Sequence, residues 1–500
     1  MAELNTSNNI LGSNYLIFLM AVYVRWCVAL HSYSGEKTPP KFGDYEAQRH
    51  WMEVTYNLQL QDWYKNTTDN DLEYWGLDYP PLTAYHSYIC SLIFAHIIPD
   101  SVQLNSSRGY ESYEHKLLMR YTVLISDLLF YIPAIICYFR IYQKQKELLP
   151  SNLCILFTLF YPGLILIDYG HFQYNCVSLG FFVSSVMLIL IQYFKTASIF
   201  FCLALNYKQM ELYHSLPFFF FFLGKFFLLV RKKKKSLALK FITQIGVVVL
   251  STFLIIWSPF LLNISYAKQV LNRIFPVERG VFEDKVSSFW CILNIVYKIH
   301  DNINNQTMFR ICFLITLFSV LPSLIDLMLT PTYEKFKLSL IINSICFFLF
   351  SYHVHEKSIL LVAIPVALDF PQHPFISFWF LSISSFSMLP LLITDGLFLP
   401  FFVLFLFYIL CSVIFLTKHT VYVFNINNPS IKIRLKTVIN FSLLGCLSLV
   451  LLTITCSPPL RYPYLWSLLI SFYSFIHFIG FLSYYYFKQC NFSFTKKKKC

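Results

Sequence analysis

Apolar runs long enough to cross a bilayer recur from one end of this 500-residue chain to the other. A helix needs roughly 20 apolar residues for that crossing, whereas membrane-spanning strands would give short alternating segments. Hydrophobic residues make up 57% of the chain and charged residues only 13%, which leaves too little polar surface for a water-soluble globule of this size. The sequence therefore predicts an all-α polytopic membrane protein.

We expect about fourteen transmembrane helices, with boundaries uncertain by several residues. The first run contains Arg25 and lacks a small-x-small cleavage pattern, so we interpret it as a membrane span and not as a cleaved signal sequence. The predicted spans are residues 13–30, 118–140, 151–167, 175–194, 197–211, 214–230, 238–262, 309–330, 336–351, 356–370, 375–392, 397–417, 438–456 and 465–487.

The apolar stretch 83–98 is excluded from these spans. Basic residues in short loops mark the cytosolic side, and a span here would put the run 231–235 on the opposite side from the cytosol. The stretch is short and contains polar side chains, which favours an interfacial helix lying on the bilayer surface. Residues 31–117 then form one long non-cytosolic loop with that helix embedded in it.

The loops on the side of residues 31–117 are rich in acidic, histidine and aromatic residues, whereas the cytosolic loops are mainly basic. Polar loops of this kind on a rigid scaffold usually bind or react, so we expect the chemistry at this face. The net charge of +13 fits cytosolic retention of loops and attraction to anionic lipid, and not nucleic-acid binding. The other loops on this side are DYGHFQYN (168–175), NYKQMELYH (206–214), FPVERGVFEDKVSSFW (275–290), YHVHEK (352–357) and SPPLRYP (457–463).

The carboxyl terminus reads KKKKC and resembles a di-lysine retrieval signal for the endoplasmic reticulum, although a generic basic tail would look the same. The 14 cysteines show no C-x-x-C pairing, which favours core residues over a disulfide framework or a zinc site. Glycosylation sequons fall in the loops assigned to the non-cytosolic side, at Asn66, Asn105, Asn263 and Asn305.

Seven fragments, in order, resemble the eukaryotic dolichyl-phosphate-glucose-dependent glucosyltransferases of the asparagine-linked glycosylation pathway. The pattern is closer to the branch that adds the first α-1,3-linked glucose to the nine-mannose lipid-linked oligosaccharide than to the sister branch that adds the second. The fragments are GDYEAQRHW (43–51), YWGLDYPPLTAYHS (74–87), SRGYESYEHK (107–116), PGLILIDYGHFQYNCVSLG (162–180), NYKQMELYH (206–214), FPVERGVFEDKV (275–286) and VHEKSILL (354–361).

The resemblance implies a C-superfamily glycosyltransferase fold in the endoplasmic reticulum membrane, with a lumenal active site. It also implies dolichyl-phosphate glucose as the donor, a lipid-linked oligosaccharide as the acceptor and no cofactor. Residues 362–500 resemble the family only in being helical and apolar. We therefore divide the chain into a catalytic transmembrane module, residues 1–361, and a set of carboxyl-terminal transmembrane helices with a basic cytosolic tail, residues 362–500.

The family's reaction inverts the anomeric centre, so a base must take the proton from the attacking sugar hydroxyl, and the lipid phosphate leaves without a general acid. Asp44, in the acidic motif of the first loop, is the candidate base, and Asp78 and Glu46 are the secondary acidic candidates. The alternatives are that Asp44 and Glu46 are solvated loop carboxylates, and that Asp78 caps the helix after Pro80 and Pro81.

The leaving phosphate needs cations or hydrogen-bond donors at the membrane edge. Two alternatives stay open, since Lys357 could pair with Glu356 and His171 could cap its helix. We find no H-E-x-x-H or paired-Asp motif and expect no obligatory metal. The candidates for the phosphate are His355, Lys357, Arg279 and Lys285, and those for other substrate contacts are Arg49, His50, Trp51, His171 and Gln173.

A transporter or flippase for a lipid-linked sugar is the competing class of function. Transporters usually carry internal repeats and ionisable groups near the bilayer centre. This chain shows no repeat, and its notable charges gather at one membrane face. The sequence thus favours surface chemistry on a lipid-linked substrate, and it favours a purely structural subunit least.

Overall fold

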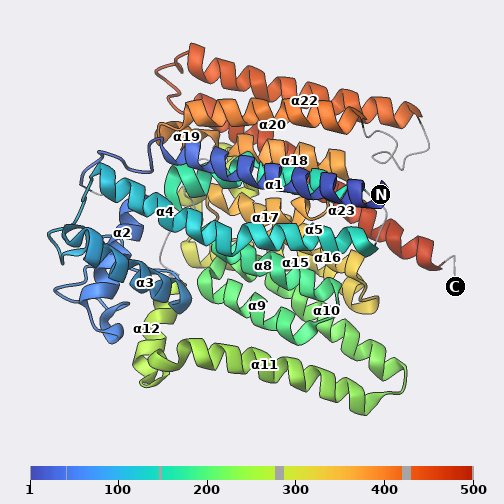
Figure 1. Cartoon of the computed structure of the whole chain (residues 1–500), viewed down its shortest axis with the longest axis horizontal. Helices are drawn as coiled ribbons and strands as arrows, with labels where there is room; N and C mark the ends of the chain where they lie inside the picture. The colour runs from blue at the N-terminus through green and yellow to red at the C-terminus, as the bar shows by residue number, and fades with distance from the viewer. Residues whose placement is uncertain (1, 41, 146–148, 276–285, 419–428, 498–500) are drawn as a thin grey trace.

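The computed structural model describes residues 2–40, 42–145, 149–275, 286–418 and 429–497. These residues form a bundle of helices that run side by side (Figure 1). The bundle contains α1 (Ala2–Ala29), α4 (Tyr113–Leu129), α5 (Tyr131–Gln145), α6 (Ser151–Leu159), α7 (Pro162–Ile165), the π-helix η3 (Leu166–Phe172), α8 (Asn175–Leu190), α9 (Phe194–Tyr207), α10 (Leu212–Arg231), α11 (Lys235–Leu261), α15 (Asn305–Leu329), α16 (Tyr333–Phe350), α17 (Ile359–Ala367), α18 (Pro374–Ser387), α19 (Leu389–Thr394), α20 (Phe398–Lys418), α22 (Pro429–Thr455) and α23 (Leu465–Lys497).

Shorter helices lie in the connections. They are α2 (Asp44–Asn57), η1 (Leu60–Asp62), α3 (Pro81–Ile97), η2 (Pro99–Val102), η4 (Gln209–Glu211), α12 (Ile264–Ile274), α13 (Phe289–Val296), α14 (Ile299–Asn302) and η5 (Glu356–Ser358).

Every predicted span coincides with one helix or with two or three consecutive helices. Among the described residues, seven helices are long and apolar enough to cross a membrane, and four shorter apolar helices accompany them. The chain is therefore a multi-pass, all-helical membrane protein, and the total of about fourteen spans stays a prediction. The predicted span 356–370 contains only the short α17, preceded by η5.

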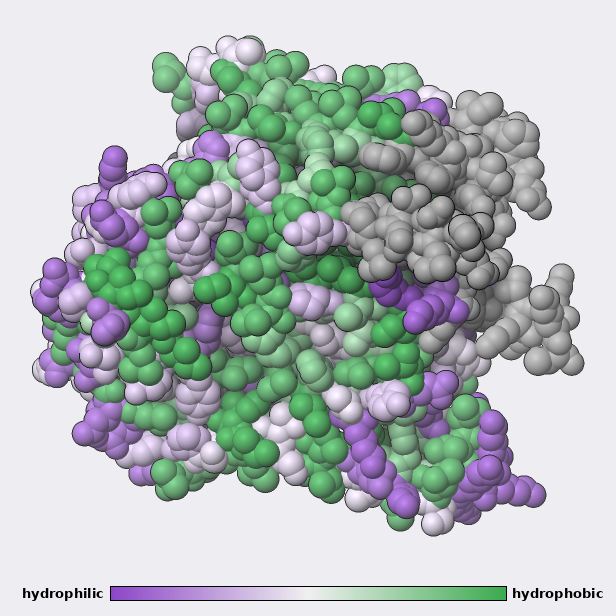
Figure 2. All heavy atoms as spheres, in the orientation of Figure 1, coloured by the Kyte–Doolittle hydropathy of each residue, from purple (hydrophilic) through white to green (hydrophobic). Residues whose placement is uncertain are grey.

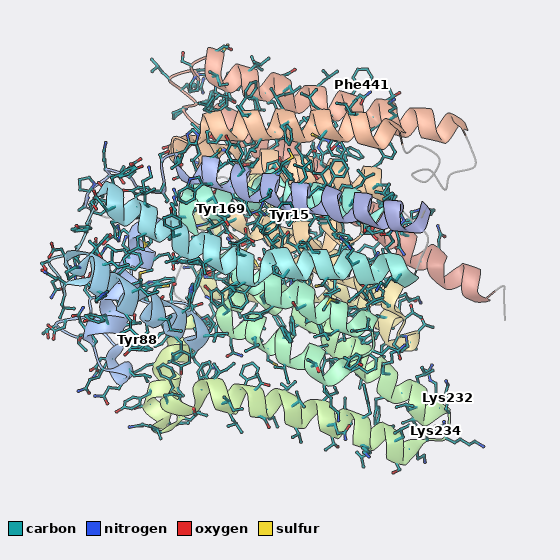
Figure 3. All side chains as sticks on the ribbon, viewed as in Figure 1. Tyr15, Tyr88, Tyr169, Lys232, Lys234 and Phe441 are labelled. Carbon is teal, nitrogen blue, oxygen red and sulfur yellow. The ribbon has the colours of Figure 1, made fainter. Side chains whose placement is uncertain are left out.

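The two ends of the bundle differ in content. Helices α2 and α3 lie together at one end, whereas the start of α1 and the end of α23 lie at the other (Figure 1). Figure 3 places Lys232 and Lys234 at the end opposite to Tyr88 of α3. The loop 31–117 and the basic run 231–235 thus occupy opposite ends of the molecule, as the charge pattern predicts.

The outer surface of the bundle is apolar between these ends. Figure 2 shows hydrophobic residues over the middle of the molecule and hydrophilic residues mainly toward its two ends. On α11 the side chains of Leu250, Leu254 and Ile255 are exposed, as expected for a helix that faces lipid.

One hydrophobic core includes residues from both sides of residue 361. The ring of Phe157 on α6 stacks on that of Phe370 at a centroid distance of 5.3 Å. Tyr161 and Ser384 share a hydrogen bond of 2.8 Å between their hydroxyls. The carboxyl-terminal helices therefore pack against the segment 151–172, which leads into the HFQYN loop.

Helix α3 covers most of the stretch predicted to be an interfacial helix. It begins with Pro81 in its first turn, where a missing N–H costs nothing, and its N-cap is Pro80 without a side-chain cap. The N-cap residue of this helix is therefore Pro80 and not Asp78. Ile89, Leu92 and Ile93 form an exposed apolar face on α3.

The remaining predictions concern the cysteines, the glycosylation sequons and the carboxyl-terminal tail. The described cysteines are free and most are at least half-buried, which fits the prediction of core residues. The four sequon asparagines are exposed. The last three residues of the KKKKC tail lie outside the described residues.

Candidate active site

Asp44 is the first residue of α2, and its carboxylate lies where three distant segments meet. Its Oδ2 accepts hydrogen bonds from Lys357 Nζ at 2.6 Å and from Gln173 Nε2 at 2.5 Å. The Nε2 of His171 lies 3.1 Å from the same oxygen. The structure therefore brings together four of the predicted site residues. Lys357 forms an ion pair with Asp44, so the alternative of a local pair with Glu356 does not account for its position.

The start of α2 is fixed by a close approach between two chain segments. Gly43 lies so close to Ser34 that a Cβ at this position would clash with it. The backbone N–H of Asp44 donates to Ser34 Oγ at 3.3 Å. A glycine before the aspartate is thus required by packing.

His171 belongs to the π-helix η3, a rare form that occurs frequently at functional sites. The next residue, Phe172, has a φ of 89°, which is strained for a bulky side chain. This turn aims His171 and Gln173 at Asp44. The carboxylate of Asp168 accepts hydrogen bonds from the first backbone N–H groups of α8, so the alternative that His171 caps this helix is wrong.

Three polar residues complete the site and were not predicted from the sequence. Lys208 Nζ donates to Gln173 Oε1 at 3.1 Å and to Asn175 Oδ1 at 2.6 Å. Asp395 Oδ2 lies 2.6 Å from His171 Nδ1. Lys208 and Asn175 stand in motifs that were quoted for the resemblance. Asp395 is the only Asp, Glu, Lys or Arg between residues 374 and 417, and an isolated charge in an apolar stretch is a functional signal.

The carboxylate of Asp44 borders a cavity of about 1200 Å³. Its walls differ in chemistry: one is polar, one aromatic and one apolar. The polar wall is Asp44, Gln173, Asn175, Lys208, His355 and Lys357; the aromatic wall, with Asp78, is Trp51, Tyr74, Trp75 and Tyr79; the apolar wall, from α10, α15 and α16, includes Leu216, Phe313, Leu317, Val320 and Phe347.

Electrostatics keep Asp44 ionised. Burial alone would raise the pKa of its carboxyl, but the charge of Lys357 and the contact with His171 outweigh burial and hold that pKa well below its usual range. The side chain is 24% exposed and faces the cavity. An ionised carboxylate at a cavity wall can accept a proton from a bound hydroxyl.

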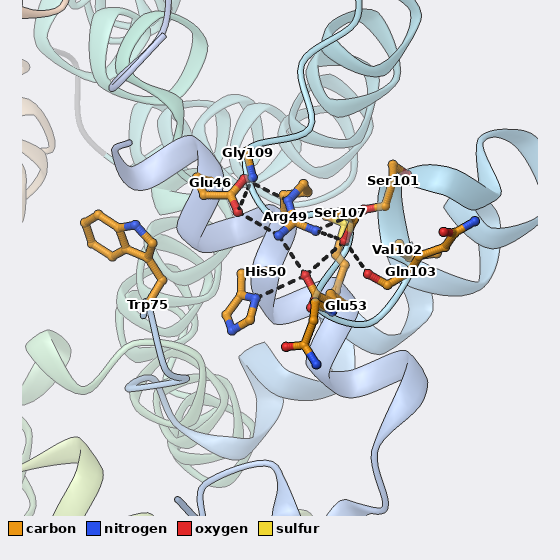
Figure 4. Close-up of polar contacts among 12 residues, drawn as sticks. Glu46, Arg49, His50, Glu53, Trp75, Ser101, Val102, Gln103, Ser107 and Gly109 are labelled. Carbon is orange, nitrogen blue, oxygen red and sulfur yellow. Dashed lines mark hydrogen bonds and ion pairs between the residues drawn. The ribbon is translucent and has the colours of Figure 1, made fainter. Parts of the chain in front are cut away.

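Glu46, Arg49 and His50 lie in a different network, on a buried face of α2 (Figure 4). Arg49 donates to Glu46 at 2.6 and 2.7 Å and to Glu53 at 2.7 Å. His50 Nδ1 lies 3.2 Å from Glu53. None of these side chains lines the cavity, so the structure separates them from Asp44 and from Trp51.

The same network fixes the rest of the loop 31–117. Arg49 also donates to the carbonyl of Ser101 at 3.0 Å, and the backbone N–H of Gly109 donates to Glu46 at 3.0 Å. Burial would raise the pKa of Glu53, but contacts with His50 and Arg49 lower it to about 2. The network therefore stabilises the fold of the loop. Glu46 is paired and buried, which excludes the reading of a solvated carboxylate.

Two predicted phosphate contacts, Arg279 and Lys285, lie outside the described residues. Within the described part of the chain, no group of three or more His, Cys, Asp or Glu residues could hold a metal ion. The absence of an obligatory metal stays a prediction.

A helical membrane protein whose carboxylate faces a cavity with polar and apolar walls suits an enzyme acting on a polar group carried by a lipid. Residues 21–484 match the model of the ALG6, ALG8 glycosyltransferase family, and the chain belongs to this family.

Curated relatives are similar over nearly their whole length. The dolichyl pyrophosphate Man9GlcNAc2 alpha-1,3-glucosyltransferase of Rattus norvegicus is 47% identical over 487 residues, which cover 94% of this chain and 95% of the rat protein. The probable enzymes of the same name from Drosophila melanogaster and Arabidopsis thaliana are 45% and 40% identical, covering 95% and 94% of this chain and 97% and 88% of theirs.

Proposed function

We propose that this protein transfers glucose, with inversion, from dolichyl-phosphate glucose to Man9GlcNAc2 on dolichyl pyrophosphate, forming the first α-1,3 linkage in the endoplasmic reticulum. The family membership and the names of the relatives support this reaction. One observation supports the proposed mechanism most directly. The HFQYN loop and the VHEK segment both contact Asp44 of the loop 31–117.

Asp44 acts as the general base in this proposal. As the mannose hydroxyl oxygen bonds to C1 of glucose, the bond from C1 to the phosphate oxygen breaks and the hydroxyl proton passes to Asp44. A low pKa keeps Asp44 ionised but makes it a weak base. The proton therefore transfers late, once the new bond has made the hydroxyl acidic.

Lys357 and His355 are the proposed partners of the donor phosphate. Both line the cavity, and Lys357 Nζ lies 2.6 Å from Asp44, so a phosphate held by Lys357 would stand beside the base. A cation in a partly desolvated site stabilises the charge on the leaving phosphate. Arg279 and Lys285 are proposed as further contacts from the segment that follows α12.

The apolar wall of the cavity is proposed to hold the first isoprene units of dolichol. It is formed by side chains of α10, α15 and α16, which line the same cavity as Asp44 and Lys357. The aromatic wall, with Trp51, Trp75 and Tyr79, suits the faces of acceptor sugars. A cavity with these walls accommodates a donor that is half lipid and an acceptor that is carbohydrate.

The proposed topology has about fourteen spans, a lumenal loop 31–117 and α3 lying in the membrane interface. The exposed apolar face of α3 and the opposite placement of Lys232 support it. A cysteine-accessibility tag near Gly109 should report the lumen, and one between Lys232 and Lys235 the cytosol. A cytosolic Gly109 would mean that α3 crosses the membrane.

The experiment that tests the proposed function uses purified protein and dolichyl-phosphate glucose. The acceptor is either unglucosylated or monoglucosylated lipid-linked oligosaccharide, and the product is sized. We expect transfer to the unglucosylated acceptor. Transfer to the monoglucosylated acceptor alone would assign the chain to the sister activity, and no transfer to either, with movement of the donor across vesicles, would favour a flippase.

A further inference from the structure

The two oxygens of the Asp44 carboxylate have different surroundings. Lys357, Gln173 and His171 all approach Oδ2, at 2.6, 2.5 and 3.1 Å. Within the described part of the chain, no hydrogen bond reaches Oδ1. One oxygen is thus in contact with three side chains, and the other stays open on a carboxylate that borders the cavity.

The ring of His171 lies between two carboxylates. Its Nδ1 is 2.6 Å from Asp395 Oδ2, and its Nε2 is 3.1 Å from Asp44 Oδ2. A neutral imidazole has one N–H, so only the protonated ring donates to both carboxylates.

The charged groups in direct contact with the ring carry a net negative charge when the imidazole is neutral. Asp44 of α2, Asp395 after α19 and Lys357 of η5 face the ring. Arg120 of α4 and Lys208 after α9 bind neighbouring groups, the carbonyl of Gly170 and the amide of Gln173. Two carboxylates and one lysine leave one negative charge among the groups in contact, and a protonated His171 cancels it.

Asp395 is held firmly at this position. Its side chain is 7% exposed, and its backbone carbonyl accepts a hydrogen bond from Ser32 Oγ at 2.5 Å. Two residues later, Leu397 packs so closely on Gly170 that a Cβ there would lie 2.7 Å from its Cδ1. The segment after α19 is therefore fixed both to the loop that follows α1 and to η3.

We propose that Asp395 is a positioning residue for glucosyl transfer. It keeps His171 protonated and oriented, so that the imidazolium holds Oδ2 of Asp44 and leaves Oδ1 to accept the proton. This inference rests on the proposed function of Asp44 as the base. The acceptor hydroxyl loses its proton to Oδ1 as its oxygen bonds to C1, and the phosphate leaves with the electrons of the broken C1–O bond.

The test is Asp395→Asn in the purified full-length protein, with kcat measured against pH. The amide still accepts from Nδ1–H but carries no charge, so His171 loses its proton at a lower pH. We expect kcat at neutral pH to fall about ten- to a hundredfold, with the donor KM unchanged and activity partly regained on acidification. Asp395→Glu should restore the wild-type pH profile.

Two further variants keep the test decisive. Ser32→Ala loosens the same segment without touching the carboxylate, so it should lower kcat without moving the alkaline limb. His171→Gln keeps a donor to Asp44 but cannot titrate, so the alkaline limb should disappear. A limb that persists in His171→Gln, or a wild-type pH profile in Asp395→Asn, overturns the inference. Normal turnover of Asp44→Asn would instead contradict the proposed role of Asp44 as the base, independently of Asp395.

Discussion

Helix α2 carries two polar clusters that resemble each other in composition and differ in use. Asp44 meets Lys357 and His171 at a cavity, whereas Arg49 meets Glu46 and Glu53 in the interior of the loop. Both clusters combine carboxylates with cations and a histidine. The motif GDYEAQRHW therefore encodes two sites on one helix, one open to a ligand and one closed.

The two clusters differ in whether any hydrogen-bonding position remains free for a ligand. The side chain of Arg49 is fully buried and spends its donors on two carboxylates, a carbonyl and a hydroxyl, which leaves no room for a substrate. Asp44 is partly exposed, and its Oδ1 faces no protein donor in the described residues. On the proposal that Asp44 is the base, the open oxygen distinguishes it from Glu46 and Glu53, whereas charge density alone does not.

Asp44→Asn should have the largest effect on the reaction itself. The amide keeps the size of the side chain but cannot take the proton, so kcat should fall on the order of 10²–10⁴-fold while protein yield stays normal. The loss should appear in kcat and not in the donor KM. Asp69→Asn, which changes an exposed carboxylate of the same loop, is the matched control. Near-normal turnover of folded Asp44→Asn would move the base role to Asp78.

Arg49→Met should lower the stability of the folded protein and leave kcat unchanged. It leaves Glu46 and Glu53 buried without their cation, a change that typically costs about 3–5 kcal/mol. We expect a lower thermal midpoint in detergent and less folded protein, with normal kcat per folded molecule. Lys65→Met removes an exposed cation from the same loop and should be neutral. A stable Arg49→Met protein with a raised acceptor KM would return Arg49 to substrate binding.

Lys357→Met should raise the donor KM about ten- to a hundredfold, since a hydrogen bond to a charged group contributes roughly 1.5–3 kcal/mol. Lys357 also lowers the pKa of Asp44, so its loss lets Asp44 protonate at a higher pH. The acid limb of kcat should therefore move to higher pH than in the wild type. Lys65→Met, at an exposed lysine, is the control. A change in the acceptor KM alone would remove Lys357 from the phosphate site.

The sequence predicts the helices well because apolar length is a strong local signal. It also identifies Asp44, His171, Gln173 and Lys357, which stand in motifs with a specific pattern. It cannot tell that Glu46 and Arg49 turn away from the cavity, because one helical register decides that and both faces are polar. Asp395 could not be predicted because its partner His171 lies 224 residues away, and the two meet only where Leu397 packs on Gly170 of η3.

Tyr74→Phe probes a side chain that lines the cavity and also contacts the closed cluster, and its effect should be the smallest. Tyr74 lines the cavity, and its hydroxyl donates to Glu46 Oε1 at 2.8 Å. Removing the hydroxyl deletes one bond of the closed cluster, about 1 kcal/mol of stability, and leaves the ring at the cavity wall. We expect a slightly lower thermal midpoint with kcat and both KM values unchanged. If the two clusters are independent, Tyr74→Phe combined with Asp44→Asn should give additive changes in stability. A kcat that falls in Tyr74→Phe alone would show instead that the closed network positions the base.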